Sequence, residues 1–97
     1  MNGFDTASVK RLYKAIALIQ NEEECAAFFD DICTIKELQD MSQRLDTAIL
    51  LTKGENYQTI SKQVAVSTAT ISRVNRCLNY GSGGYKTILE RLDGEKQ

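Results

Sequence analysis

The sequence predicts an all-α protein of about six helices. The chain of 97 residues contains no proline, the residue that most strongly interrupts a helix. Apolar residues recur at intervals of three and four positions along most of the chain, which is the spacing of one face of an α-helix. No stretch alternates apolar and polar residues as a half-buried strand does. A chain of this length corresponds to one domain, and we expect residues 1–97 to form it.

Apolar periodicity and a capping signal define the first two helices. The first is predicted from about Thr6 to Gln20, and its apolar face consists of Val9, Leu12, Tyr13, Ile16 and Ile19. Asn21 and Glu24 have the spacing of a capping box, in which two side chains satisfy the free N–H groups of a helix start. The second helix that they open carries Phe28, Phe29 and Ile32.

A long third helix is predicted from Thr34 to about Lys53. Thr34 and Glu37 form a second capping box at its start. Its main apolar stripe consists of Leu38, Met41, Leu45, Ala48 and Ile49. Leu50 and Leu51 widen this stripe beyond what one side of a small bundle can cover, which indicates burial against a second subunit.

A helix-turn-helix is predicted at residues 57–78, after Gly54 has ended the third helix. Ile60 and Val64 are four residues apart and share one face of its first helix. The facing stripe on its second helix consists of Ile71, Val74 and Leu78. Every apolar position that the motif needs is therefore filled.

The turn of this motif consists of Ala65, Val66 and Ser67. These residues provide a small side chain, an apolar plug and a capping hydroxyl, so we expect the second helix to start at Ser67 or Thr68. Ala65 is an imperfection, because a glycine would turn more easily.

The outward face of the second helix suggests DNA as a partner. Small residues allow a helix to lie deep in a major groove, and arginine is the commonest donor to guanine. Ala69, Ser72, Arg73 and Arg76 point away from the buried stripe. The full set of expected contacts, with the first two on phosphates, is Gln58, Lys62, Ser67, Thr68, Ala69, Ser72, Arg73 and Arg76. The alternative is an ordinary surface helix with two solvated arginines, since plain helical bundles also contain this geometry.

A glycine-rich segment, Gly81 to Gly84, separates this motif from the last helix. We predict a flexible joint there. An anion-binding nest is the weaker alternative, because the segment lacks the spacing and the lysine of a phosphate-binding loop. The short helix that follows carries Tyr85, Ile88, Leu89 and Leu92.

Charge is distributed unevenly along the chain. The net charge of −1 argues mildly against DNA binding. Residues 21–40 hold seven acidic side chains against Lys36, whereas residues 57–91 hold five basic side chains against Glu90. A chain of this kind can present a basic face to DNA. The acidic run is explained mostly by carboxylates that complement helix dipoles.

The composition excludes several classes of function. No apolar run approaches the roughly 18 residues of a membrane span, and no secretory signal is present. Cys25, Cys33 and Cys77 form no CxxC motif, and the chain has no histidine. We therefore expect reduced thiols in a cytoplasmic protein and no metal site. Without histidine no Ser/His/Asp or Cys/His set exists, so we expect neither an enzyme nor a cofactor.

Three segments carry a resemblance to a known family. They are the stretch from Thr34 to Arg44, LLTKGE from Leu50 to Glu55, and TATISR from Thr68 to Arg73. Over about residues 34–92 the chain resembles the tryptophan-repressor superfamily, in particular its YerC/YecD-type branch. The resemblance implies an intertwined homodimer in which the first, second and last helices of two subunits interlock. The dimerisation core is then expected at residues 1–54 and 84–93. The loop GSGGY departs from the tighter connection of the repressor.

The resemblance also implies a small-molecule pocket beneath the helix-turn-helix. In the tryptophan repressor two arginines sandwich the indole ring and a threonine helps to hold its polar end. The matching residues here are Arg44, Arg73, Thr34 and Thr70, and Cys77 stands where the repressor carries a serine. The implied effector is L-tryptophan or a related aromatic amino acid, and a different or absent effector stays open. Alternatively, the two arginines contact the DNA backbone or acidic neighbours.

These observations predict a homodimeric, sequence-specific DNA-binding regulator that represses transcription by occupying a two-fold-symmetric operator. Each subunit is expected to place its second motif helix in a major groove of double-stranded DNA. The alternative is a helical dimeric protein-interaction module that keeps the fold without operator binding. The net charge of −1 favours this alternative.

Overall fold

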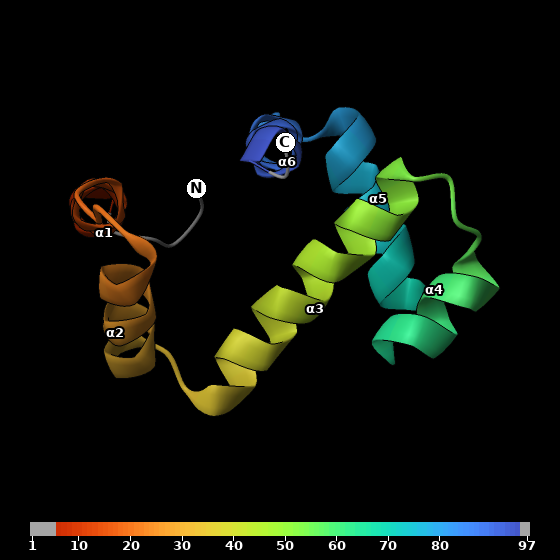
Figure 1. Cartoon of the computed structure of the whole chain (residues 1–97), viewed down its shortest axis with the longest axis horizontal. Helices are drawn as coiled ribbons and strands as arrows, with labels where there is room; N and C mark the ends of the chain where they lie inside the picture. The colour runs from red at the N-terminus through yellow and green to blue at the C-terminus, as the bar shows by residue number, and fades with distance from the viewer. Residues whose placement is uncertain (1–5, 96–97) are drawn as a thin grey trace. The chain divides into compact units, whose positions relative to one another are not determined.

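The structure is a computed structural model that describes residues 6–95. Those residues form six α-helices and no strand, which confirms the predicted all-α class (Figure 1). In chain order the helices are α1 (Thr6–Ala17), α2 (Glu22–Ile32), α3 (Ile35–Thr52), α4 (Tyr57–Val64), α5 (Thr68–Tyr80) and α6 (Gly84–Glu95).

The backbone groups into two compact units, Met1–Leu38 and Gln39–Gln97. The first unit holds α1, α2 and the start of α3, and the second holds the rest of α3 with α4, α5 and α6. The prediction of a single domain at residues 1–97, with a dimerisation core at 1–54 and 84–93, stays a prediction. Residues 1–5 and 96–97 of that domain lie outside the described residues.

The first helix is shorter than the sequence predicts. It ends at Ala17, whereas the apolar spacing indicates an end near Gln20. The N–H groups of Leu18 and Ile19 instead donate to carbonyl oxygens three residues earlier, at 3.2 and 3.1 Å. Bonds of this i→i+3 type tighten the last turn of a helix and end it. Ile19, predicted on the face of this helix, therefore lies beyond its end.

The predicted capping box at Thr34 is confirmed in full, and the one at Asn21 is confirmed in part. At the start of α2, the Asn21 side chain accepts from the N–H of Glu24 at 2.9 Å. The Glu24 carboxylate accepts from the N–H of Gln20 at 3.0 Å, one residue before the cap. At the start of α3, Thr34 and Glu37 each accept from the other's N–H, at 3.1 and 2.8 Å. These bonds satisfy donors that would otherwise have no partner in the helix.

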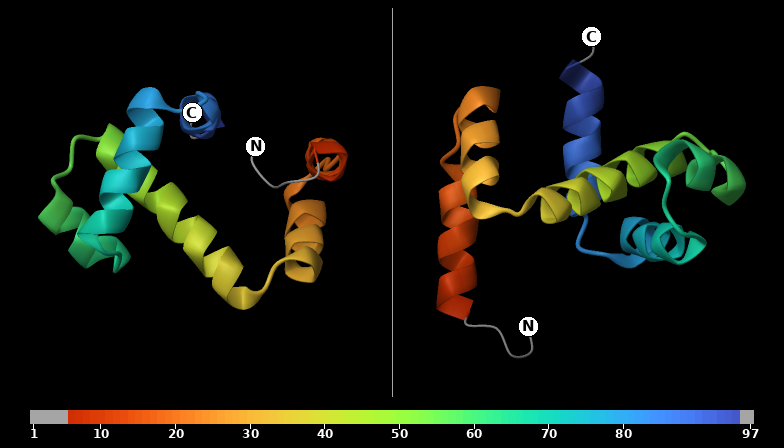
Figure 2. Two further views of the ribbon diagram at one scale, coloured as in Figure 1. Left: turned by 180° about the vertical axis from the view of Figure 1, so that it is seen from behind. Right: turned by 90° about the horizontal axis from the view of Figure 1, so that it is seen from below.

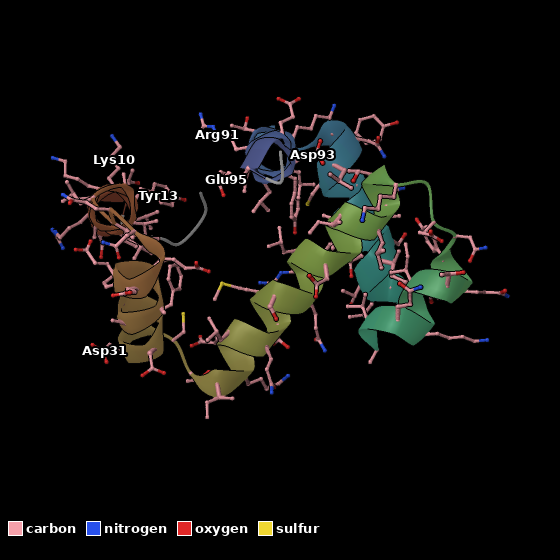
Figure 3. All side chains as sticks on the ribbon, in the orientation of Figure 1. Lys10, Tyr13, Asp31, Arg91, Asp93 and Glu95 are labelled. Atoms are coloured by element: carbon pink, nitrogen blue, oxygen red, sulfur yellow. The ribbon has the colours of Figure 1, made fainter. Side chains whose placement is uncertain are left out.

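The first unit leaves much of its apolar surface uncovered. No residue of α1 or α2 is fully buried. Leu12 of α1 and Ile32 of α2 are 39 % and 50 % exposed, although Phe28 and Phe29 pack edge to face with ring centroids 5.9 Å apart. Figure 3 shows Lys10 and Tyr13 projecting from α1. Two short helices with so little buried surface need a further apolar surface to cover them.

The core lies in the second unit. Its fully buried apolar residues, each exposed by 1 % or less, are Ala48, Ile60, Ile71 and Val74. They come from α3, α4 and α5, and Figures 1 and 2 show α4 and α5 side by side in every view. Thr47 is also buried, and its hydroxyl donates to the Gln43 carbonyl at 2.7 Å. The predicted facing of α4 and α5 is thus confirmed.

Glycines end two segments of the second unit. Gly54 has φ +84° and lies two residues after Thr52, the last residue of α3, which confirms that the helix ends before this glycine. Gly83 has φ +86°, and α6 begins at Gly84, so the predicted glycine break is one residue shorter than expected. Gly81 has no room for a side chain, because a Cβ there would collide with the carbonyl oxygen of Cys77.

Candidate nucleic-acid interface

A three-residue turn, Ala65 to Ser67, joins α4 to α5. Ala65 has φ 60° and ψ 46°, a left-handed conformation that is unfavourable for any residue with a Cβ. Its N–H donates to the Ser61 carbonyl at 3.0 Å and closes the end of α4. The prediction that this position would suit a glycine is therefore confirmed.

Ser67 caps α5. Its hydroxyl oxygen accepts from the N–H of Thr70 at 3.2 Å, which confirms Ser67 rather than Thr68 as the capping residue. The same hydroxyl donates to Oγ1 of Thr70 at 3.2 Å. Both hydroxyls therefore already have a partner before any ligand or DNA arrives.

The outward side of the motif is open to solvent. Ile71 and Val74 are buried on the inner side of α5, whereas the predicted contact residues belong to the rest of α5, to its cap and to α4. All eight of them are exposed, namely Gln58, Lys62, Ser67, Thr68, Ala69, Ser72, Arg73 and Arg76. DNA contact requires this exposure, and the contact itself stays a prediction.

A groove of about 610 Å³ lies within the second unit, where α3, α5 and α6 come together. Arg44 and Leu45 line it from α3, Cys77 from α5, and Ser82 and Tyr85 from the loop and α6. Its lining is mainly apolar, with one guanidinium and a few polar atoms. This composition is typical of a small-ligand site.

The groove brings together only part of the predicted effector set. Arg44 and Cys77 line it, whereas Thr70 and Arg73 do not. Arg73 is exposed on α5, and the Thr70 hydroxyl accepts from Ser67. Thr34 belongs to the first unit, where its hydroxyl caps α3. In this chain the groove therefore presents a single arginine.

Tyr85 adds a titratable group to this groove. Burial raises the pKa of its phenol above the ordinary value of 10.0, while the charge of Arg44 lowers that pKa and Cys77 raises it. The phenol is consequently protonated at neutral pH and has an O–H to donate. The sequence places Tyr85 on the last helix, as the structure confirms, but gives no sign that this residue lines a groove.

Two further residues escape sequence analysis. Asn56 caps α4, accepting from the N–H of Thr59 at 2.8 Å, and the position of an asparagine directly before this helix could have indicated it. The hydroxyl of Ser61 donates to the carbonyl of Val66 at 2.8 Å. No sequence signal indicates this bond, because it depends on how the turn folds back.

Other kinds of site are not found in the part of the chain that the structure describes. Residues 6–95 contain no group of three or more His, Cys, Asp or Glu side chains that could hold a metal ion. Within the same range, no helix has both the length and the apolar character needed to cross a membrane.

Known proteins are similar to this chain in sequence and in fold. Residues 7–93 match the family described as Trp repressor protein. The chain is 48 % identical to YerC of Bacillus subtilis (strain 168) over 82 residues, which cover 84 % of this chain and 79 % of YerC.

Two solved structures are also similar. The crystal structure of a proposed Trp repressor from Staphylococcus aureus is 45 % identical with a TM-score of 0.85, covering 92 % of this chain and 89 % of the other. That of a TrpR-like protein from Eubacterium eligens ATCC 27750 is 43 % identical with a TM-score of 0.88, covering 96 % of each chain. With a family match over nearly the whole described chain and relatives above 40 % identity, this protein belongs to the Trp repressor family.

Proposed function

We propose that this protein is a dimeric, sequence-specific DNA-binding regulator that represses transcription by occupying a two-fold-symmetric operator. The observation that carries the proposal is the helix-turn-helix, whose inner side is buried at Ile60, Ile71 and Val74 and whose outer side is exposed and polar. A packed inner side fixes the motif, and an exposed outer side can meet a groove. Membership of a family of DNA-binding regulators supports the same function.

Each subunit would place α5 in a major groove. The exposed Ala69 and Ser72 are small enough to allow close approach, and Arg76 can reach a guanine edge. Lys62 on α4 would contact phosphates, which fixes the register without selecting the sequence. Paired subunits then require two half-sites about 34 Å apart, one helical turn of DNA.

The effector is the finer part of the proposal. We propose that the groove beside α5 takes a small anion with an apolar or aromatic body, such as L-tryptophan or a related amino acid. The Arg44 guanidinium would hold the carboxylate, and the protonated phenol of Tyr85 would donate a hydrogen bond. Because Cys77 of α5 also lines the groove, an occupant would contact the helix proposed to enter DNA.

Selection of bound duplexes from a random pool, with and without candidate amino acids, tests the main proposal. We expect enrichment of a two-fold-symmetric site with two half-sites one helical turn apart. Failure to enrich any sequence would reject operator binding. It would favour the second candidate function, a dimeric protein-interaction module, which the net charge of −1 supports.

Calorimetry with tryptophan, related amino acids and indoles tests the effector. Arg44→Ala should abolish the heat of binding, whereas Arg73→Ala should retain it, because only Arg44 lines the groove. Ligand and DNA must also strengthen each other's binding by the same factor. An equal loss of binding heat in the two variants would instead support a site in which both arginines hold the ligand. No heat with any ligand, together with full DNA affinity, would reject an effector of this class.

A further inference from the structure

The turn between α4 and α5 contains a hydrogen bond that the proposed function does not yet use. The Ser61 hydroxyl donates to the Val66 carbonyl at 2.8 Å, within the ordinary range for O–H···O bonds. The bond is partly buried and links residues five apart. Ser61 lies on α4, while Val66 lies in the turn directly before the cap of α5.

This bond differs from those of other hydroxyls on the helices. Hydroxyls inside a helix usually donate to a carbonyl three or four residues earlier. Ser42, Thr47, Thr52 and Thr87 all do so in this chain. Ser61 instead donates forward, out of its own helix and into the turn, so it ties the end of α4 to the approach of α5.

The backbone of the turn needs an additional interaction to hold its conformation. Ala65 adopts the left-handed conformation that an alanine resists, so local preference opposes the turn rather than holding it. Val66 follows without belonging to either helix. Its carbonyl would otherwise be a partly buried acceptor seeking a donor. The Ser61 hydroxyl supplies that donor from the body of α4.

We propose that Ser61 is a positioning residue for DNA recognition: its bond to Val66 fixes the angle at which α5 leaves α4. This inference rests on the proposed function, because the orientation of α5 decides which side chains reach base edges. Recognition of bases demands closer alignment than attraction to phosphates, which is largely insensitive to sequence. Loss of the bond should therefore reduce discrimination between DNA sequences more than it reduces binding to DNA in general.

The test compares Ser61→Ala, Ser61→Thr and the matched control Ser42→Ala in the full-length protein. Ser42 is an exposed helix serine whose bond stays within α3, so its loss removes a hydroxyl without touching the turn. Affinity is measured for the selected operator and for a scrambled duplex of equal length. Circular dichroism at the same temperature confirms that each variant is folded.

Ser61→Ala should lose about tenfold in operator affinity, equivalent to about 1.4 kcal/mol. Its affinity for the scrambled duplex should change less than about twofold, because phosphate contacts tolerate misalignment. Ser61→Thr retains the hydroxyl and should recover most of the discrimination. Equal losses on both duplexes, or a loss also seen in Ser42→Ala, would reduce Ser61 to a general stabilising role and overturn the proposal.

A measurement without DNA separates this inference from the proposed function. The carbonyl chemical shift of Val66 should change in Ser61→Ala, and the backbone of residues 65–67 should become more mobile on the nanosecond scale. Unchanged signals there would overturn the positioning role even if operator binding is intact. A wild-type protein that selects no duplex would instead overturn the proposed function, and the positioning role with it.

Discussion

At the scale of single residues, the side chains at the start of α5 differ from those farther along it. The first are hydrogen-bonded within the protein, and the second are exposed. Ser67 and Thr70 are exposed or partly exposed, yet their hydroxyls bond each other and the start of the helix. Ser72 and Arg76 are exposed on the outward side. The Ser67 hydroxyl already donates its one hydrogen to Thr70, so it must give up that bond to donate to DNA. We therefore expect the largest effects on recognition from Ser72 and Arg76.

Ser72→Ala and Arg76→Ala should each weaken operator binding by about 1–3 kcal/mol and relax specificity at one base position. Lys62→Ala should weaken all sequences alike and reduce the salt dependence by about one phosphate contact. Titrations of operator and scrambled duplex at several salt concentrations distinguish these effects. Lys14→Ala on α1 is the charge-matched control. Unchanged DNA binding in all three variants would reject the proposed docking of α5.

The phenol of Tyr85 gives a prediction for alkaline pH. Its pKa is raised by burial in the folded protein, so folding favours the protonated form. The associated stability is present below the unfolded value of 10.0 and is lost as pH rises through the higher folded pKa. The free energy of unfolding, measured with urea above pH 10, should therefore fall less steeply with pH in Tyr85→Phe than in wild type. Tyr80→Phe is the control, because that ring is 87 % exposed, and an equal change in both variants would contradict the assignment.

At the scale of helices and turns, the turn between α4 and α5 requires a backbone conformation that its alanine disfavours. Ala65 has φ 60°, and the bond from Ser61 lies across the same turn. A glycine would adopt this conformation without steric cost. Residue 65 therefore affects the stability of the turn, whereas Ser61 is proposed to affect the alignment of α5.

Ala65→Gly should raise the free energy of unfolding by roughly 1 kcal/mol, because relief of the left-handed alanine outweighs the added freedom of the unfolded chain. Chemical denaturation at fixed protein concentration measures it. Ala26→Gly, at an exposed position inside α2, should instead destabilise by about 0.5–1 kcal/mol. A loss of stability in Ala65→Gly would mean that the alanine methyl group makes contacts that outweigh the strain.

The helices themselves could be predicted from the sequence because their signals are local. Apolar spacing located all six, and the capping boxes at Asn21 and Thr34 determined two starts. The end of α1 could not be predicted, since a tight last turn and a continuing helix carry the same apolar residues. The groove was predicted only in part. Tyr85 joins Arg44 there because of how the glycine loop brings α6 against α3 and α5, and spacing along one helix does not encode that.

At the scale of the whole molecule, the distribution of buried residues is what the proposed dimer would require. Among residues 6–95, every fully buried residue belongs to the second unit, while α1 and α2 bury none. On α3, Ile35 and Leu38 are 80 % and 41 % exposed, and the wide stripe at Leu50 and Leu51 is only half-buried. A second copy of the chain would cover such surfaces, as the predicted intertwined dimer requires.

Sedimentation at sub-micromolar concentration should therefore show twice the chain mass. Ile35→Glu should shift the protein toward monomer or unfold it, because a buried charge without a partner is costly. Gln63→Glu adds the same charge at an exposed position of α4 and should leave the dimer intact. A compact, stable wild-type monomer at this concentration would reject the intertwined dimer.

The residues that hold the turn are separate from the outward positions 69, 72 and 76, and this separation has a consequence for evolution. Ala65 and Ser67 belong to the turn, and Ser61 binds it from α4. The bonds of the turn use the Ser61 and Ser67 hydroxyls and the backbone, and none involves a side chain at the outward positions. Mutational drift at 69, 72 and 76 can thus exchange the chemistry that α5 offers while the scaffold persists. After gene duplication, one copy could acquire a new DNA target through substitutions at these positions, and each intermediate sequence would still fold.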